Sequence, residues 1–300
     1  MVKLTILDGG MGRELERIGA PFSQPLWSAQ ALIESPHYVK QAHQAFIDSG
    51  AEIITVNSYA CVPFHLGEEL YAKQGVQLAR KAAQLAYEVA KDAEPKVLVA
   101  GSIPPVFGSY RPELFEAEKG KRISAELLQA QDEYVDLWLV ETVASIAEAK
   151  ALNEVLSLTD KPSYICFTLQ DEEEATAKLR SGEEVADAVE CLLDAGSKGL
   201  FFNCSIPEVI EQAIRDVNRV CKLRGISLEI GVFANSFTPI KSGHQANESI
   251  QTVRHFSPEE YLQFAKRWHE LGASIIGGCC GIEPRHIEVL ARWKAGLDSE

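Results

Sequence analysis

Eight short apolar segments, each followed by a stretch with helical periodicity, recur along almost the whole chain. They lie at residues 4–8, 52–58, 96–102, 136–142, 163–169, 199–204, 228–236 and 273–278. Because these segments are nearly continuous in apolar residues, they are typical of parallel strands covered on both faces. Strands that alternate with helices throughout a chain predict a parallel sheet of the α/β class.

The segments between these strands carry the start and stop signals of helices. The stretches 35–50 and 257–272 both begin with Ser-Pro, which combines a potential N-cap with a proline suited to the first turn, and both end on glycine. The stretches 182–196 and 206–225 also end on glycine. We therefore expect helices in all four stretches.

Eight strand–helix units over residues 1–300, with no linker between them, predict a single-domain (β/α)8 TIM barrel. The main alternative is a doubly wound open sheet. That fold usually carries a strand–GxGxxG–helix unit, which the sequence lacks.

Composition narrows the possible partners. The formal net charge of −14 argues against binding to nucleic-acid phosphates or to an anionic membrane surface.

No apolar run approaches the ~20 residues that span a bilayer, and the first residues resemble a strand more than a signal peptide. Seven cysteines without a secretion signal favour the reducing cytoplasm. The sequence carries no signal for the oligomeric state.

Two connections are longer than the others. Residues 102–123 follow the third strand and residues 237–256 follow the seventh, so both lie on the side where barrel active sites form. Long loops in this position often act as lids or substrate walls. We expect His244, in the second loop, to have a surface or loop-stabilising role, because no histidine here belongs to a metal-binding motif.

Three cysteines fall at the carboxyl ends of predicted strands. Cys204 follows the sixth strand, and the adjacent Cys279 and Cys280 follow the eighth. Since the strand ends of a barrel converge, three thiols there predict a zinc site with three protein ligands and one open position. Two core thiols or a vicinal disulfide are the alternative interpretation. The other four cysteines are expected to be ordinary buried residues: Cys61, Cys166, Cys191 and Cys221.

Glycines surround the adjacent pair. Successive side chains of a regular strand point to opposite faces, so Cys279 and Cys280 could not reach one ion from such a strand. Gly277, Gly278 and Gly281 are expected to let the backbone bend until both sulfurs face the same way.

The proposed ligand set favours one kind of chemistry. Three thiolates leave zinc with a formal charge of about −1, which makes it a weak activator of water compared with zinc held by neutral histidines. A thiol that coordinates to such an ion is deprotonated yet remains nucleophilic. The pattern therefore favours alkylation of a thiol substrate over hydrolysis.

Several motifs occur in a characteristic order: "DGGMGREL", "TVNSYA", "AGSIPP", "ETVAS", "FNCS", "ANS" and "GGCCG". With these motifs the chain resembles, over essentially its whole length, the homocysteine S-methyltransferase family. That family includes S-methylmethionine-dependent enzymes, betaine–homocysteine methyltransferase and the homocysteine module of cobalamin-dependent methionine synthase. The resemblance implies a zinc-dependent methyltransferase that makes methionine from homocysteine.

The resemblance also implies roles for individual residues. Zinc would be bound by Cys204, Cys279 and Cys280, and homocysteine would lie near a second set of residues: Asp8, Gly9, Thr55, Tyr59, Glu141 and Asn235. The two carboxylates of that set are candidates for binding the α-ammonium group.

The methyl donor is expected to be a small cation. S-methylmethionine ranks first, S-adenosylmethionine second and betaine third, because the chain has no room for the extra modules of folate- or cobalamin-dependent enzymes. Aromatic side chains that could face such a cation are Phe22, Trp27, Phe107 and Tyr110. Two other functions stay open, namely a metal-dependent barrel hydrolase and a non-catalytic zinc- or thiol-binding protein.

Overall fold

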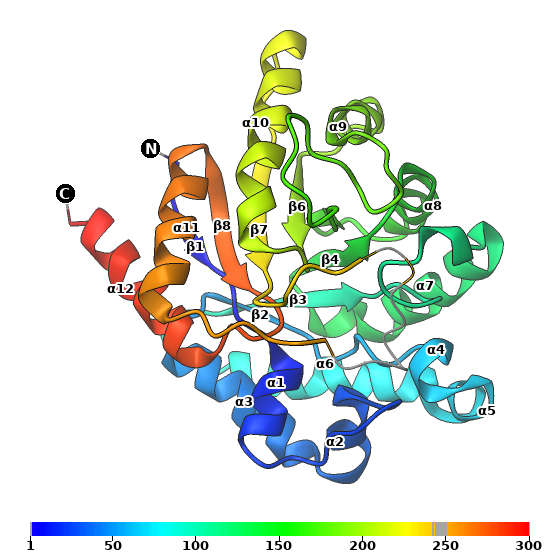
Figure 1. Cartoon of the computed structure of the whole chain (residues 1–300). Coiled ribbons are helices and arrows are strands. Elements are labelled where there is room, and N and C mark those ends of the chain that lie inside the picture. The colour runs from blue at the N-terminus through cyan, green and yellow to red at the C-terminus, as the bar shows by residue number, and fades with distance from the viewer. Residues whose placement is uncertain (1, 242, 244–250, 300) are drawn as a thin grey trace.

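Eight parallel strands form one sheet in the order β1-β8-β7-β6-β5-β4-β3-β2 (Figure 1). The computed structural model describes residues 2–241, 243 and 251–299. The strands are β1 (Thr5–Ile6), β2 (Ile53–Thr55), β3 (Leu98–Ile103), β4 (Leu137–Val143), β5 (Ser163–Phe167), β6 (Gly199–Asn203), β7 (Glu229–Ala234) and β8 (Ala273–Gly278).

The sheet closes between its first two strands. A parallel bridge joins Leu7 to Ile53, and the Asp8 backbone N–H donates a 3.0 Å hydrogen bond to the Ile53 carbonyl. β1 and β2 are shorter than expected because the pairing here is limited to these few contacts. The predicted (β/α)8 barrel is confirmed.

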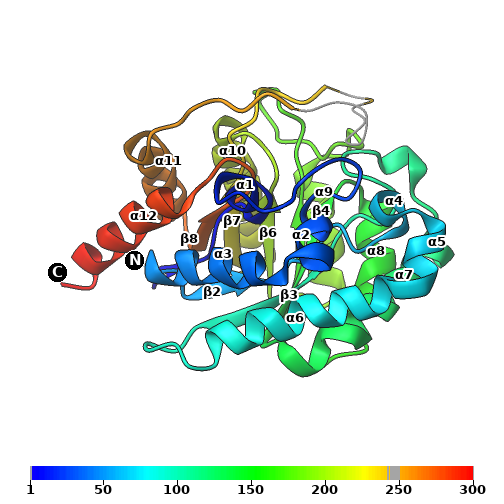
Figure 2. The same cartoon turned by 90° about the horizontal axis from the view of Figure 1, so that it is seen from below.

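Helices surround the closed sheet (Figures 1 and 2). The α-helices are α1 (Met11–Arg17), α2 (Ser28–Glu34), α3 (Pro36–Asp48), α4 (Pro63–Leu66), α5 (Glu68–Leu70), α6 (Val76–Ala90), α7 (Ala117–Gln131), α8 (Ile146–Leu156), α9 (Val185–Asp194), α10 (Pro207–Arg224), α11 (Pro258–Glu270) and α12 (Pro284–Leu297). A π-helical turn precedes α6 (Tyr71–Gly75), and 3-10 turns occupy Pro112–Leu114 and Asp132–Tyr134.

The four helices expected from their end signals are all present, as α3, α9, α10 and α11. The Ser257 side chain accepts a 3.2 Å hydrogen bond from the Glu260 N–H, and Glu260 bonds back to the Ser257 N–H, which makes a complete capping box. Ser35 precedes α3, but its side chain makes no capping bond. Both serines therefore stand at the predicted N-cap position, but only Ser257 makes the capping hydrogen bond.

Two apolar layers follow from the alternation of side chains along the strands. Every strand or its immediate end contributes to a small cluster inside the barrel, which contains Leu7, Ile53, Ala100, Leu137, Leu139, Cys166, Phe201, Phe233 and Ile275. The neighbouring strand residues belong to a much larger cluster that joins the sheet to the helices. Both faces of the strands are thus buried, as the continuous apolar runs predicted.

Two smaller expectations need correction, and a third, about His244, is not tested. The loop after β3 ends earlier than residue 123, because α7 begins at Ala117. Cys191 is half-buried rather than buried, because its helix α9 turns that position partly outward, whereas Cys61, Cys166 and Cys221 are buried as expected. His244 and most of the middle of the 237–256 loop lie outside the described residues. In the part of the chain that is described, no helix is long and apolar enough to cross a membrane.

Glu148, in the first turn of α8, gives a test of how burial affects stability. Burial raises the pKa of its carboxyl group to about 7, although the Ala144 N–H donates a 2.8 Å hydrogen bond to it. A raised folded-state pKa means that this group's contribution to stability is fully present below pH ~4.5 and is lost as the pH rises through 7. The shift corresponds to about 3 kcal/mol.

We expect Glu148→Gln to remove that pH dependence, because the amide keeps an oxygen for the Ala144 N–H but never ionises. The free energy of unfolding of the variant relative to the natural protein should therefore increase by up to about 3 kcal/mol between pH 4.5 and pH 8. Urea denaturation at both pH values measures the difference. A difference that does not change with pH would contradict the assignment.

Candidate metal and substrate site

A cavity of about 220 Å³ opens at the carboxyl ends of the strands. Its wall includes side chains that follow β1, β2, β4, β6 and β8, together with residues of the loops after β3 and β7. A second hollow, of about 270 Å³, lies near the start of α10 and is lined mainly by glutamates, with no thiol and no aromatic ring. The cysteines and carboxylates that the sequence singled out line the cavity of about 220 Å³.

The three cysteines of strands six and eight line this cavity together. The Sγ atoms of Cys204 and Cys279 lie 2.6 Å apart, and the Cys279 side chain is hydrogen-bonded to that of Cys280. Hydrogen bonds with Cys204 and Cys280 raise the pKa of the Cys279 thiol, whereas the bond with Cys279 lowers the pKa of Cys280. The fold therefore gathers three thiols from positions 75 residues apart into one group.

The glycines around the pair have different tasks from those expected. Only Gly281 has a left-handed backbone, with φ of +84°, so it supplies the turn. Gly277 and Gly278 are needed for close packing instead, since a Cβ atom at Gly278 would lie 2.2 Å from Ile282 and one at Gly277 would lie 2.5 Å from the Asp8 carbonyl oxygen. The expectation that all three bend the chain is wrong for these two.

Cys204 itself has a φ of +47°, a conformation that costs a non-glycine residue about 1–2 kcal/mol. Its side chain is 4% exposed. The strained backbone directs the residue after β6 toward Cys279 instead of letting the strand continue. Strain of this kind persists where surrounding contacts hold it, and it is concentrated at functional sites.

The donor set fits zinc in its chemistry. Zinc takes tetrahedral thiolate ligands at about 2.3 Å, which places neighbouring sulfurs about 3.8 Å apart. Within the described ranges, no three His, Cys, Asp or Glu side chains already surround a point suited to a metal ion. Zinc binding would require the Cys204 and Cys279 sulfurs, which are 2.6 Å apart, to separate by about 1.2 Å.

Asp8 lies directly after β1 and is buried. Its carboxylate accepts hydrogen bonds from the Thr55 N–H (2.7 Å) and the Thr55 hydroxyl (3.0 Å). Loss of water contact nevertheless raises the pKa of Asp8 to about 7, with a smaller contribution from the negative charge of Glu141. The neighbouring Gly9 also lines the cavity, and a Cβ atom there would meet the Ile282 carbonyl at 2.3 Å.

Glu141 occupies the inner end of β4. It accepts a 2.6 Å hydrogen bond from the Ser102 hydroxyl, and burial raises its pKa to about 7. Asp8 and Glu141 thus form a pair of buried carboxyl groups that face one cavity. The ammonium group of a ligand in this cavity would place a positive charge beside both carboxyl groups.

Tyr59 lines the cavity as well, and its hydroxyl is within 2.7 Å of the Ser109 hydroxyl and 3.2 Å of the Thr142 hydroxyl. Thr142, whose φ is +58°, is held in turn by two 3.0 Å hydrogen bonds with the Asn203 side chain. Asn203 immediately precedes Cys204, so Tyr59 and the cysteine share one hydrogen-bonded wall.

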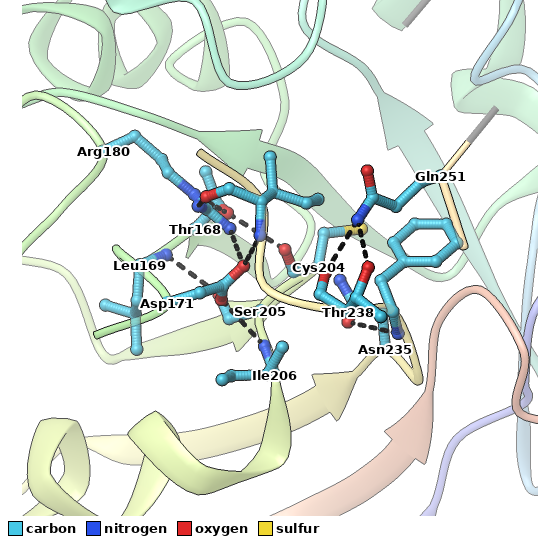
Figure 3. A network of polar contacts seen from close by, with 12 residues as sticks. Thr168, Leu169, Asp171, Arg180, Cys204, Ser205, Ile206, Asn235, Thr238 and Gln251 are labelled. Carbon is cyan, nitrogen blue, oxygen red and sulfur yellow. Dashed lines mark hydrogen bonds and ion pairs between the residues drawn. The ribbon is translucent and has the colours of Figure 1, made fainter. Parts of the chain in front are cut away.

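Asn235 does not belong to the cavity wall, unlike the other residues of the expected substrate set. It is fully buried after β7, where its side-chain oxygen accepts a 3.1 Å hydrogen bond from the Phe237 N–H (Figure 3). The side chain thus supports the turn that leads into the 237–256 loop. Its role in substrate binding is not supported by this position.

Three of the four suggested aromatic residues line the cavity, namely Phe22, Trp27 and Tyr110. Phe107 does not, because its ring packs against Phe115, with ring centroids 6.1 Å apart. Sequence reasoning missed further wall residues: Arg13, His65, Phe233, Phe237 and Gln251. Phe233 in β7 and Phe237 and Gln251 in the following loop lay where such residues were expected, whereas Arg13 in α1 and His65 in α4 carried no such signal.

A network missed entirely by the sequence lies next to Cys204 (Figure 3). The Arg180 side chain forms an ion pair with Asp171 and donates a 3.3 Å hydrogen bond to the Thr168 hydroxyl. Thr168 donates in turn to the Cys204 carbonyl oxygen at 3.2 Å. No motif distinguishes these residues from ordinary surface charges.

Comparison with known proteins is consistent with this site. Residues 5–293 match the family model described as homocysteine S-methyltransferase. Homocysteine S-methyltransferase 1 of Zea mays is 31% identical over 96% of this chain and 93% of its own length, and its Arabidopsis thaliana namesake is 30% identical over 96% and 92%. Among solved structures, the metallated form of the Escherichia coli homocysteine methyltransferase MmuM is similar with a TM-score of 0.78 and 26% identity, covering 97% of this chain and 96% of that one.

Proposed function

The chain belongs to the homocysteine S-methyltransferase family and is a methyltransferase that acts on homocysteine, and on that premise we propose that it uses zinc and S-methylmethionine. The zinc would be held by Cys204, Cys279 and Cys280, and S-methylmethionine would be the methyl donor. The observation that carries the zinc assignment is the meeting of three thiols from two strand ends at one cavity.

The reaction forms one C–S bond and breaks another. The homocysteine sulfur attacks a methyl carbon of the donor sulfonium, and the electron pair of the broken bond stays on the donor sulfur, which leaves as a neutral thioether. The thiol proton of homocysteine passes to solvent. Zinc, when bound by the three thiolates, acidifies the substrate thiol and leaves it nucleophilic.

The protein's own side chains orient the two substrates. Asp8 and Glu141 bind the α-ammonium group of homocysteine, whose positive charge stabilises the ionised form of these buried carboxyl groups. A hydrogen bond from Thr55 fixes the position of Asp8, and Gly9, which has no side chain, leaves room beside it. Because the leaving group is neutral, no general acid is needed, and orientation provides most of the rate enhancement.

The cavity favours a small cationic donor. The aromatic residues Phe22, Trp27 and Tyr110 in its wall support a sulfonium or quaternary ammonium ligand, although the Tyr110 ring already has the Arg180 guanidinium 4.8 Å from its centre. S-adenosylmethionine would add a whole adenosine to what the walls of this cavity must hold beside homocysteine, whereas S-methylmethionine would not. S-methylmethionine therefore ranks ahead of S-adenosylmethionine, with betaine as the further small candidate. Free thiols at this site are also consistent with a reducing compartment such as the cytoplasm.

A donor comparison with chain-deuterated homocysteine tests this assignment. Transfer from S-methylmethionine yields two methionines, one from each substrate, and the label identifies the one made from homocysteine. Zinc-loaded protein is incubated in turn with S-methylmethionine, S-adenosylmethionine and betaine, and labelled methionine is measured by mass spectrometry. We expect the largest kcat/KM with S-methylmethionine.

Other results of that experiment have definite meanings. A larger kcat/KM with S-adenosylmethionine or betaine overturns the donor assignment and leaves the acceptor intact. Zinc binding without labelled methionine from any donor would instead favour a zinc- or thiol-binding protein. Hydroxide-dependent hydrolysis with metal bound through histidine would favour the hydrolase alternative.

A further inference from the structure

An ion pair with little solvent exposure lies beside the cavity, and methyl transfer as described does not use it. Arg180 Nη2 and Asp171 Oδ2 are 3.0 Å apart, and the two side chains are 6% and 1% exposed (Figure 3). Taking two charges out of water is costly unless their remaining hydrogen-bonding groups are satisfied. The contacts of this pair therefore indicate what it holds in place.

Asp171 holds backbone from two other loops. Its Oδ1 accepts a 3.0 Å hydrogen bond from the Ile206 N–H, just after β6, and its Oδ2 accepts a 2.8 Å bond from the Ile240 N–H, after β7. Arg180 donates to the Ile240 carbonyl at 3.0 Å, and its guanidinium lies 4.8 Å from the centre of the Tyr110 ring. The pair thus joins the loops that follow β3, β5, β6 and β7.

Cys204 is held on its carboxyl side by this arrangement. Its carbonyl oxygen accepts a hydrogen bond from the Thr168 hydroxyl, which itself accepts one from Arg180, and the chain two residues later is fixed at Ile206 by Asp171. On the amino side, the Cys204 N–H donates a 3.2 Å hydrogen bond to the Phe233 carbonyl. The left-handed φ of +47° at Cys204 is thus constrained by contacts before and after its Cα atom, and the Arg180 network supplies those after it.

We propose that Thr168, Asp171 and Arg180 form a clamp that positions the Cys204 thiol for metal binding. The clamp acts through the backbone of Cys204 and touches neither substrate, so its members are positioning residues. This inference rests on the proposed role of Cys204 as a ligand. Groups that orient metal ligands typically change metal affinity or activity by about 10- to 100-fold when they are removed.

Two variants test the clamp from different sides. Thr168→Val keeps the branched shape and removes only the hydroxyl between Arg180 and Cys204. Arg180→Lys keeps the charge and removes the planar fork that serves three partners. Arg17→Lys is a control for the exchange of arginine for lysine, because Arg17 also makes two hydrogen bonds to a buried carboxylate, that of Glu14, but lies on α1 and is 53% exposed.

Three quantities are measured on each full-length variant: zinc affinity by competition with a chromogenic chelator, kcat and KM for homocysteine, and the iodoacetamide alkylation rate of Cys204 in metal-free protein. We expect Thr168→Val and Arg180→Lys to lower zinc affinity about 10- to 100-fold. kcat should fall with it, while Cys204 alkylation should become at least about tenfold faster, because the buried thiol loses its fixed position. Arg17→Lys should leave all three near the natural values.

Unchanged Cys204 alkylation and unchanged zinc affinity in Thr168→Val would overturn the clamp, even if Arg180→Lys fails to fold. If instead the natural protein binds no zinc, the proposed function fails, and the alkylation rates still report whether the clamp positions Cys204. A uniform loss of thermal stability in Thr168→Val without faster alkylation would assign the network a structural role only and contradict the proposal.

Discussion

Replacing Cys280 by alanine is expected to abolish both zinc retention and methyl transfer. The variant leaves two of three proposed thiolate ligands, and the substrate thiol then loses the group that acidifies it. A rise of about 4 kcal/mol or more in the activation free energy corresponds to a rate reduction of at least about 10³-fold. Metal content after dialysis and labelled methionine formation measure the two effects.

Cys191→Ala and Cys221→Ala are the matched controls for this experiment, because both cysteines lie on outer helices away from the cavity. Both should keep zinc and activity. Cys204→Ala and the Cys204→Ala/Cys280→Ala double variant should lose as much activity as Cys280→Ala alone. The effects of removing residues that act as a unit do not add. Full activity in Cys280→Ala would refute the three-cysteine site.

Glu141→Gln is expected to lower kcat/KM for homocysteine by roughly 10- to 100-fold, chiefly through KM. The amide keeps an acceptor for the Ser102 hydroxyl but removes the negative charge that would face the α-ammonium group. A hydrogen bond to a charged partner contributes about 1.5–3 kcal/mol, which corresponds to this range. Initial rates over a homocysteine concentration series, with the donor saturating, give the two constants.

Glu148→Gln is the matched control for Glu141→Gln. Glu148 is also buried, also has a pKa raised to about 7 by burial, and follows the same strand, but it does not line the cavity. Its amide variant should therefore keep the natural KM for homocysteine. Equal changes in both variants would mean that loss of a buried charge affects activity through the fold, and the assignment of Glu141 to the substrate would be wrong.

The sequence predicted that the three cysteines meet, because strand ends in a closed barrel lie at one end. Once Cys204 and the Cys279–Cys280 pair were placed after the sixth and eighth strands, their convergence followed from the topology. The same reasoning placed Asp8 and Glu141 at the cavity. Residues named for their motif alone were less reliable, since Asn235 supports a turn and lies outside the wall.

Side chains that act from loops could not be placed in this way. Asp171 and Arg180 lie in a small antiparallel turn after β5, marked by the bridge between Leu169 and Leu179, and nothing in their spacing indicates burial. Their partners Ile206 and Ile240 are 35 and 69 residues from Asp171. Long-range contacts of this kind depend on how the loops pack, which periodicity does not describe.

The sequence by itself determined the eight-stranded barrel, the convergence of Cys204, Cys279 and Cys280 at its strand ends, and the family of the enzyme. These features depend on hydrophobic periodicity and on short motifs, which are local properties of the chain. The tertiary structure decided the left-handed turn at Cys204, the separate packing tasks of Gly277 and Gly278, and the clamp around Arg180. Those features arise where segments far apart in the chain compete for the same space and hydrogen bonds, so they exist only once the barrel has closed.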